Sequence, residues 1–276
     1  MTNYREHPAL NWSKLRAMAQ SPLAFATQED VQETDAMRLG TEVHRLLLTP
    51  DEPAPRIAVV PAEYLTESGR LSTAKAAKAW VAEQGDVVIY TPDELAKFLD
   101  TTAAMAHAAQ SHLTASKWLA GIESAERELY WSQPSGSELV ECKGKADAVI
   151  VVDGKRMLVD VKTCSGSRGF SPSWFARRVI DLGYHGQLAM YARGLAADGV
   201  QVDGWGWLVI QSEAPHDVMC LTASERMMAA GDALFLDLLH KYASSSRSGV
   251  WSGVAAEAVE IDLPKWAQGA DSAEEF

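Results

Sequence analysis

The first part of the chain carries apolar side chains at the spacing of helices. They recur every three or four positions over residues 36–48, and Pro50 stands where this predicted helix ends. A second helix is predicted over residues 91–110, because Thr91 can cap its start and Glu94 follows three residues later. Shorter helices are expected within residues 11–28 and 112–119, and an exposed segment leading into a helix within residues 51–90.

Strands dominate after residue 125. The runs "ERELYWSQ", "ELVECKGKADAVIVV" and "KRMLVDVKT" are rich in β-formers and are separated by turn residues. Two helices, two strands and a long amphipathic helix are predicted next, over residues 171–183, 184–199, 204–212, 216–223 and 223–246. This order predicts one α/β domain over residues 1–250 with a helical N-terminal part, followed by an acidic tail over residues 251–276.

The second and third strands form a predicted hairpin that places two acids together. Asp153-Gly154 is typical of a two-residue type I′ turn. Counting back from this turn sets Asp147 directly opposite Asp160, so the two side chains share one face of the sheet. Lys162 lies two residues beyond Asp160 and points to the same face.

Two opposed carboxylates destabilise a hairpin unless something compensates them. A divalent cation between Asp147 and Asp160 would reverse the sign of this interaction, and Mg²⁺ prefers a few carboxylate oxygens together with water and phosphate oxygens. A lysine beside the cation is what metal-assisted phosphodiester hydrolysis needs. The alternative is a solvated hairpin end, in which the two acids pair with Lys145 and Lys162. The same register count sets Lys145 opposite Lys162.

Composition narrows the class of protein. The 276 residues have a net charge of −12 and contain three separated cysteines, which is a poor basis for an iron–sulfur or other four-cysteine site. No apolar run could span a membrane, and the first residues do not resemble a signal peptide, so a cytoplasmic location is expected. Residues 141–193 nevertheless carry nine basic and five acidic residues, against 16 and 32 elsewhere. This locally basic stretch either binds phosphate or reflects chance.

Four motifs together resemble the PD-(D/E)xK nuclease superfamily, and in particular the RecE-like (exonuclease VIII) phage exonucleases. They are "GTEVH" with His44, then Asp147, then "DVK" with Asp160, and finally "GYHGQLAMY", which is similar to the QxxxY motif of those nucleases. The resemblance covers residues 10–212. It implies a restriction-endonuclease-like core with a mixed central sheet flanked by helices.

The resemblance also implies roles for individual residues. Metal would be bound by His44, Asp147, Asp160 and the backbone carbonyl of Val161, and Lys162 would be the catalytic lysine together with the two aspartates. Mg²⁺ is the implied ion and Mn²⁺ an alternative, with no iron–sulfur cluster. Contacts with DNA are expected from Gln187, Tyr191, Arg168, Arg177, Arg178 and Lys145. Glu126, expected just before the first strand, is an accessory acid.

Each of these residues also has a plain structural interpretation. His44 follows a predicted apolar face and alone reads more readily as a buried histidine with a backbone partner; Gly40, one turn before it, leaves room for a close neighbour. Two features depart from the family pattern. The proline of the "PD" element is absent, and Asp160 replaces the commoner glutamate.

The resemblance implies a metal-dependent exonuclease that digests duplex DNA ends, 5′ to 3′, in phage-type recombination inside a bacterial host. It further implies a single-strand annealing protein as partner and a homo-oligomeric ring, a trimer or tetramer, around the DNA. Two alternatives stay open: a structure-specific or single-strand nuclease of the same superfamily, and a catalytically silent DNA-binding protein on the same fold.

Overall fold

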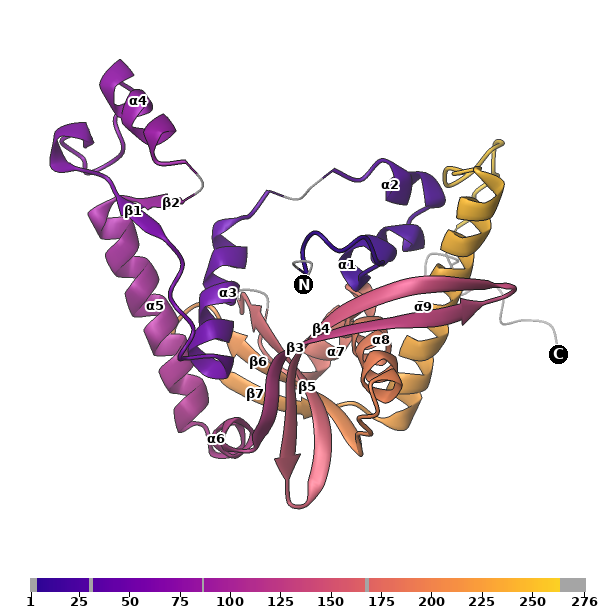
Figure 1. The fold of residues 1–276 in the computed structure, drawn as a ribbon. Coiled ribbons are helices and arrows are strands. Elements are labelled where there is room, and N and C mark those ends of the chain that lie inside the picture. Colours follow the sequence, from indigo (N-terminus) through magenta and orange to yellow (C-terminus); the bar gives the residue numbers. More distant parts are fainter. Residues whose placement is uncertain (1–3, 30–31, 86, 167–168, 264–276) are drawn as a thin grey trace, which may run out of the picture.

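The centre of the molecule is a five-stranded mixed sheet, shown in Figure 1 as a computed structural model that describes residues 4–29, 32–85, 87–166 and 169–263. The strands stand in chain order: β3 (Ile122–Ser135), β4 (Glu138–Val152), β5 (Lys155–Cys164), β6 (Gly204–Gln211) and β7 (Val218–Thr222). The β5–β6 pair is parallel and the other pairs are antiparallel. The predicted α/β class with a mixed sheet is therefore confirmed.

Helices cover both faces of this sheet (Figure 1). One face packs against α1 (Trp12–Leu15), α7 (Pro172–Asp181), α8 (Tyr184–Ala197) and α9 (Glu225–Ser248). The other packs against α3 (Asp35–Leu48), α5 (Pro92–Ser111) and α6 (Leu113–Ala120). Along β5, Leu158 belongs to the first core and Val159 to the second, because successive strand residues point to opposite faces.

The capping residues account for the positions of the predicted helices. The side chain of Thr91 accepts a hydrogen bond from the Glu94 backbone, and the Glu94 carboxylate accepts one from the Thr91 backbone, so the capping box of α5 is present. The Ser171 hydroxyl accepts from Trp174 at the start of α7. Gly183, with φ of 69°, turns the chain from α7 into α8.

A small projection, whose strands were not predicted from the sequence, stands beside α5 (Figure 1). It contains two parallel strands, β1 (Ile57–Val59) and β2 (Val88–Tyr90), together with a short 3₁₀ helix, η2 (Ala62–Tyr64), and α4 (Lys75–Glu83). Each strand is three residues long, which is too short to show a period of two in the sequence. Only the helix in this segment was expected.

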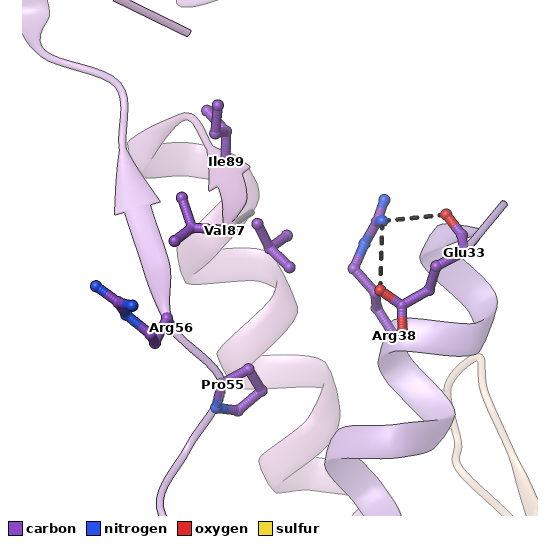
Figure 2. A pocket seen from close by; sticks show the side chains of 7 residues that line it. Glu33, Arg38, Pro55, Arg56, Val87 and Ile89 are labelled. Carbon is purple, nitrogen blue, oxygen red and sulfur yellow. Dashed lines mark hydrogen bonds and ion pairs between the residues drawn. The ribbon is translucent and has the colours of Figure 1, made fainter. Parts of the chain in front are cut away.

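A hollow of about 490 Å³ lies where this projection meets the start of α3 (Figure 2). It is lined by aliphatic residues of β2 and by Arg38, whose guanidinium bonds to the Glu33 backbone and pairs with Asp35. None of the predicted site residues lines it. The hollow is therefore separate from the hairpin acids.

The N-terminal segment completes the sheet at one edge of β4. Leu10 exchanges backbone hydrogen bonds with Glu141 and Lys143, and the Lys143 ammonium donates to the carbonyls of Tyr4 and His7. After α1, a 3₁₀ turn, η1 (Arg16–Ala19), and α2 (Pro22–Ala26) continue the predicted interrupted helix.

The start of the predicted acidic tail packs on this N-terminal layer. Trp251 stacks on Phe25 at 5.5 Å between ring centroids, and the Ser252 carbonyl accepts from the backbone of Leu23. Residues 251–263 contain no helix or strand, and residues 264–276 lie outside the described residues. The proposed boundary at residue 250 stays a prediction.

Candidate active site

The hairpin forms in the predicted register and then opens at the two acids. Val152 pairs with Lys155 and Ala148 with Val159, while Asp153 and Gly154 have φ of 50° and 74°, as a type I′ turn requires. The pairing of β4 with β5 stops at Ala148 and Val159. The Asp147 carboxylate accepts a hydrogen bond of 2.7 Å from the Val161 backbone. Just beyond the last residue pair, the Asp147 side chain thus accepts the hydrogen bond that a backbone carbonyl of β4 would otherwise accept.

The predicted facing of Lys145 and Lys162 does not form. Beyond Ala148, β4 continues its pairing with β3, where Lys145 stands across from Glu128, and β5 continues with β6. The Lys145 ammonium instead lies 2.6 Å from the Glu126 carboxylate. The prediction was wrong because it extended the hairpin register past the point where the strands part.

His44 reaches this opening from α3. Its Nε2 lies 3.0 Å from the carbonyl of Val161, and its Nδ1 lies 3.6 Å from Glu126 and 3.8 Å from Asp147. The helix can come this close because a Cβ at Gly40 would already stand 3.1 Å from the Thr163 hydroxyl, as the glycine spacing suggested. Burial lowers the pKa of His44, but the Asp147 and Glu126 carboxylates outweigh it and raise the pKa above its usual value.

Glu126 lies within β3 and not before it, which corrects the sequence prediction. Its φ is 49°, an uncommon conformation for a non-glycine residue, and its neighbours in β3 pair with Ala146 and Ala148. The register therefore sets Glu126 across from Asp147. Burial raises the pKa of Glu126, but hydrogen bonds from His44 and Lys145 bring it below its ordinary value.

Asp160 and Lys162 form a buried ion pair on the next strand. The Lys162 ammonium lies 2.6 Å from Oδ2 of Asp160, whose side chain is 2% exposed. Neither carboxylate oxygen of Asp160 has a well-directed hydrogen bond. Burial raises the pKa of Asp160 to about 6. For Lys162, burial lowers the pKa, but the two aspartates outweigh this and raise it, so the lysine stays charged.

Gln187 and Tyr191 share one face of α8, as their spacing predicted. The Gln187 amide donates to the Tyr191 hydroxyl at 3.1 Å, and Tyr191 is only 8% exposed. The ring fits because β4 has Gly144 beside it: a Cβ there would stand 2.8 Å from the ring. Tyr191 is therefore packed against the sheet, with Gln187 the more accessible of the two.

The predicted arginines are less closely tied to the site. Arg177 is exposed on α7, and Arg178 lies over the Trp174 ring at 5.0 Å. Arg168 lies outside the described residues. Five of the nine basic residues counted between positions 141 and 193 already have charged or carbonyl partners: Lys143, Lys145, Arg156, Lys162 and Arg193. More than half of these basic groups therefore already have partners within the chain, and phosphate binding by this stretch stays a prediction.

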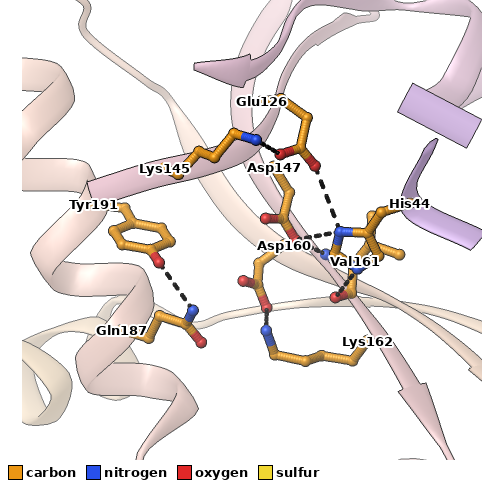
Figure 3. Close-up of polar contacts among 9 residues, drawn as sticks. All are labelled: His44, Glu126, Lys145, Asp147, Asp160, Val161, Lys162, Gln187 and Tyr191. Atoms are coloured by element: carbon orange, nitrogen blue, oxygen red, sulfur yellow. Dashed lines mark hydrogen bonds and ion pairs between the residues drawn. The ribbon is translucent and has the colours of Figure 1, made fainter. Parts of the chain in front are cut away.

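Figure 3 shows how these side chains converge from α3, β3, β4 and β5 around the Val161 peptide. Among the described residues, His44, Glu126 and Asp147 offer ligand atoms that lie within 4.8 Å of one another. Asp160 is turned towards Lys162 and is not part of this triplet. The arrangement brings an imidazole, three carboxylates, a carbonyl and two ammonium groups into one opening of the sheet.

Comparison with known families and solved structures identifies the family of this chain. Residues 11–261 match the model of a PDDEXK-like domain of unknown function, DUF3799. The chain belongs to this PDDEXK-like family. A search of the curated proteins gave no significant match.

One solved structure supports the PDDEXK-like fold along the whole chain. A candidate exonuclease from Eubacterium rectale is 11% identical, with 96% of each chain covered and a TM-score of 0.58. The structure of SSO0001 is 14% identical over 79% of this chain and 87% of that one, at a TM-score of 0.32. The first of these supports the fold; the second is too distant for an argument.

Nucleases of the PDDEXK superfamily use divalent metals, and the residues present fit such an ion. Lys162 pairs with one oxygen of the buried Asp160 carboxylate, but neither oxygen has a directed hydrogen bond, so a bound cation would stabilise this group further. Carboxylates and a backbone carbonyl are ligands that Mg²⁺ accepts, and an imidazole nitrogen suits Mn²⁺ better. Which of the four predicted ligands bind stays a prediction.

The sequence placed Glu126 outside the first strand, whereas it lies within β3 and near His44 and Asp147. Its short run of β-formers gave no sign that the strand begins earlier, at Ile122, so the residue seemed to lie outside the sheet. The only signal available was a register count across the β3–β4 turn at Gly136, whose φ is 62°.

No helix among the described residues has the length and apolar character needed to cross a bilayer.

Proposed function

We propose that this protein is a metal-dependent deoxyribonuclease that hydrolyses phosphodiester bonds from the ends of duplex DNA. The observation that carries the proposal is the gathering of His44, Asp147, Asp160 and Lys162 around one peptide, Val161, where β4 and β5 part. The candidate exonuclease of the same fold supports the reaction class. The acids stand where strand pairing would be better served by neutral residues, which is expected of a site kept for chemistry.

The chain's own groups divide the work of phosphodiester hydrolysis. The Asp147 carboxylate accepts a hydrogen bond from the Val161 N–H and so holds this peptide in place. The Val161 carbonyl lies within hydrogen-bond distance of the His44 imidazole. Asp147, Asp160, His44 and this carbonyl would hold the ion, with Glu126 beside them. A bound divalent cation would lower the pKa of a water and polarise the phosphate.

Lys162 is the group suited to act on the scissile phosphate. Its side chain is 16% exposed and its ammonium stays protonated, so it can offset charge that develops on a phosphate oxygen or orient the attacking water. Gln187 on α8 lies beside the same opening, and its predicted contact with the DNA backbone is part of the proposal. Each group is held by a strand or helix, and such support keeps reacting groups in place.

End-labelled duplexes provide the test. Linear duplex, covalently closed circles and single strands of the same sequence are incubated with Mg²⁺, Mn²⁺ or EDTA. We expect that only the linear duplex is degraded, and that this degradation requires Mg²⁺ or Mn²⁺. Comparing 5′- and 3′-labels gives the polarity, which we propose to be 5′ to 3′. Efficient cutting of closed circles would refute the exonuclease proposal, and cutting in EDTA would refute the metal.

The biological setting is a further part of the proposal and rests on the resemblance to RecE-like exonucleases. We propose a role in phage-type recombination, with a single-strand annealing protein as partner and a ring-shaped homo-oligomer of three or four copies around the DNA. Four of the nine basic residues between positions 141 and 193 pair with acids, so the charge of this stretch adds little support for the ring. Mass photometry of the free protein and of a complex with a blocked DNA end tests the ring: a single copy on DNA would refute it.

A further inference from the structure

Lys162 has a second neighbour besides Asp160. Its ammonium lies 4.9 Å from the centroid of the Tyr184 ring, on the face of the ring. The ammonium is therefore held between a carboxylate on its own strand and an aromatic face on α8. An attraction between a cation and a ring face strengthens where water is excluded, as it is here.

The position of the ring is determined by the helix that carries it. Gly183, with φ of 69°, ends the link from α7, so Tyr184 is the first residue of α8. Its ring contacts Phe175 at 6.2 Å, and Phe175 meets Trp207 edge-on at 5.9 Å. Trp207 stands beside Asp160 in the parallel β5–β6 register. A row of aromatic rings thus runs from Trp207 on β6, beside the acid, through Phe175 to the Tyr184 ring at the lysine.

The two partners of Lys162 differ in what a metal does to them. A cation bound at Asp160 neutralises the carboxylate and weakens its hold on the ammonium. The Tyr184 ring is not a ligand, so its attraction for the ammonium remains. A long lysine side chain with only one weakened partner would sample several rotamers, whereas a catalytic donor needs a fixed position.

We propose that Tyr184 is a positioning residue that keeps the Lys162 ammonium at the scissile phosphate once Asp160 is engaged by metal. This inference rests on the proposed nuclease function. It assigns the role to the face of the ring and not to the hydroxyl. The alternative is that Tyr184 only fills space against Phe175.

Substitutions that separate the ring from its bulk provide the kinetic test. Tyr184→Phe keeps the aromatic face and should retain kcat within about 2-fold, whereas Tyr184→Leu keeps apolar bulk and should lower kcat about 2- to 30-fold. KM should change little in both, because the ground-state DNA contacts are untouched. Tyr242→Leu is the matched control: the Tyr242 ring packs against Phe25 and Trp251 and not against Lys162, and its loss should leave kcat unchanged.

Fluorinated phenylalanines at position 184 provide a test that preserves shape. Each added fluorine weakens the negative ring face, so kcat should fall stepwise from none to three fluorines. This series also serves if Tyr184→Leu fails to fold. A flat series, full activity in Tyr184→Leu, or equal losses in Tyr184→Phe and Tyr184→Leu would each overturn the proposal.

NMR of the metal-free and Ca²⁺-bound protein gives a readout that needs no activity. With ¹³C-labelled lysine, the ε-CH₂ signal of Lys162, assigned through Lys162→Met, should show an upfield ring-current shift in both states. The shift should disappear in Tyr184→Leu. Its absence with Ca²⁺ would overturn the proposal. If the wild type degrades no DNA with any metal, the nuclease function fails, while the shift still reports on the contact between ring and lysine.

Discussion

Ionisation of Asp160 should destabilise the metal-free protein, and Asp160→Asn measures this cost. Burial raises the pKa of this carboxyl in the folded protein to about 6, from its ordinary value of 3.8, although Lys162 opposes the shift. The folded protein therefore holds the proton more tightly than the unfolded chain does. Between these two pKa values the free energy of unfolding falls as pH rises, and above about pH 6 it levels off.

The size of the effect follows from the same shift. A difference of roughly 2 pKa units at 1.36 kcal/mol each gives about 3 kcal/mol. The amide introduced by Asp160→Asn carries no titrating proton, so the variant lacks this dependence. The loss of the ion pair with Lys162 adds a term to the variant that is constant with pH, because the lysine stays charged in this range. The difference in unfolding free energy, wild type minus variant, should therefore fall by about 2 kcal/mol between pH 4 and 7, because part of the full change lies below pH 4.

Urea unfolding in EDTA, followed by tryptophan fluorescence at several pH values, measures this difference. Glu123→Gln is the control. Its carboxylate pairs with Arg156 at the surface, and the hydrogen bond lowers its pKa, so its stabilisation is lost as pH falls and not as pH rises. A difference curve for Asp160→Asn that is flat, or that rises with pH, would refute the reasoning. The ion pair with Lys162 would then outweigh burial.

Three more outcomes follow from the site. Lys162→Ala should lower single-turnover cleavage about 10²- to 10³-fold while DNA affinity by anisotropy is kept, and Lys155→Ala, at the hairpin turn, should behave as wild type. Gly144→Ala places a Cβ 2.8 Å from the Tyr191 ring and should lower stability by about 1–3 kcal/mol in urea melts; an unchanged midpoint would show that the ring moves freely. Lys145 pairs with Glu126, so a divalent ion that engages the acid should free the lysine for phosphate: the log–log salt slope of binding should steepen by about 0.9 with Ca²⁺ against EDTA, and Lys145→Met should abolish the change.

Local rules predicted the elements of the fold well. Three predictions that depend on a few neighbouring residues are confirmed: the cap at Thr91, the turn at Asp153-Gly154 and the spacing of His44 from Gly40. The strand pair β1–β2 could not be predicted, because three-residue strands carry no period and their partners are 31 positions apart, as Ile57 and Val88 are.

The site was predicted less completely because its geometry depends on where strands separate. A hairpin count sets Asp147 opposite Asp160 but does not reveal that pairing stops at Ala148. Because the strands separate, Lys145 pairs with Glu126, and Asp160 pairs with Lys162. The local charge count likewise could not show that Lys143, Lys145, Arg156 and Arg193 have acidic or carbonyl partners on other segments of the chain.

The contact between Phe25 and Trp251 has a consequence for synthesis of the protein on the ribosome. The layer of α1 and α2 is completed by a residue translated 226 positions later. At about 5–20 residues per second, the N-terminal layer waits roughly 10 to 45 s for this partner. Until then its apolar side chains are open to chaperones and to neighbouring nascent chains. A ribosome that stalls before codon 251 therefore releases a chain whose N-terminal layer lacks its last aromatic partner.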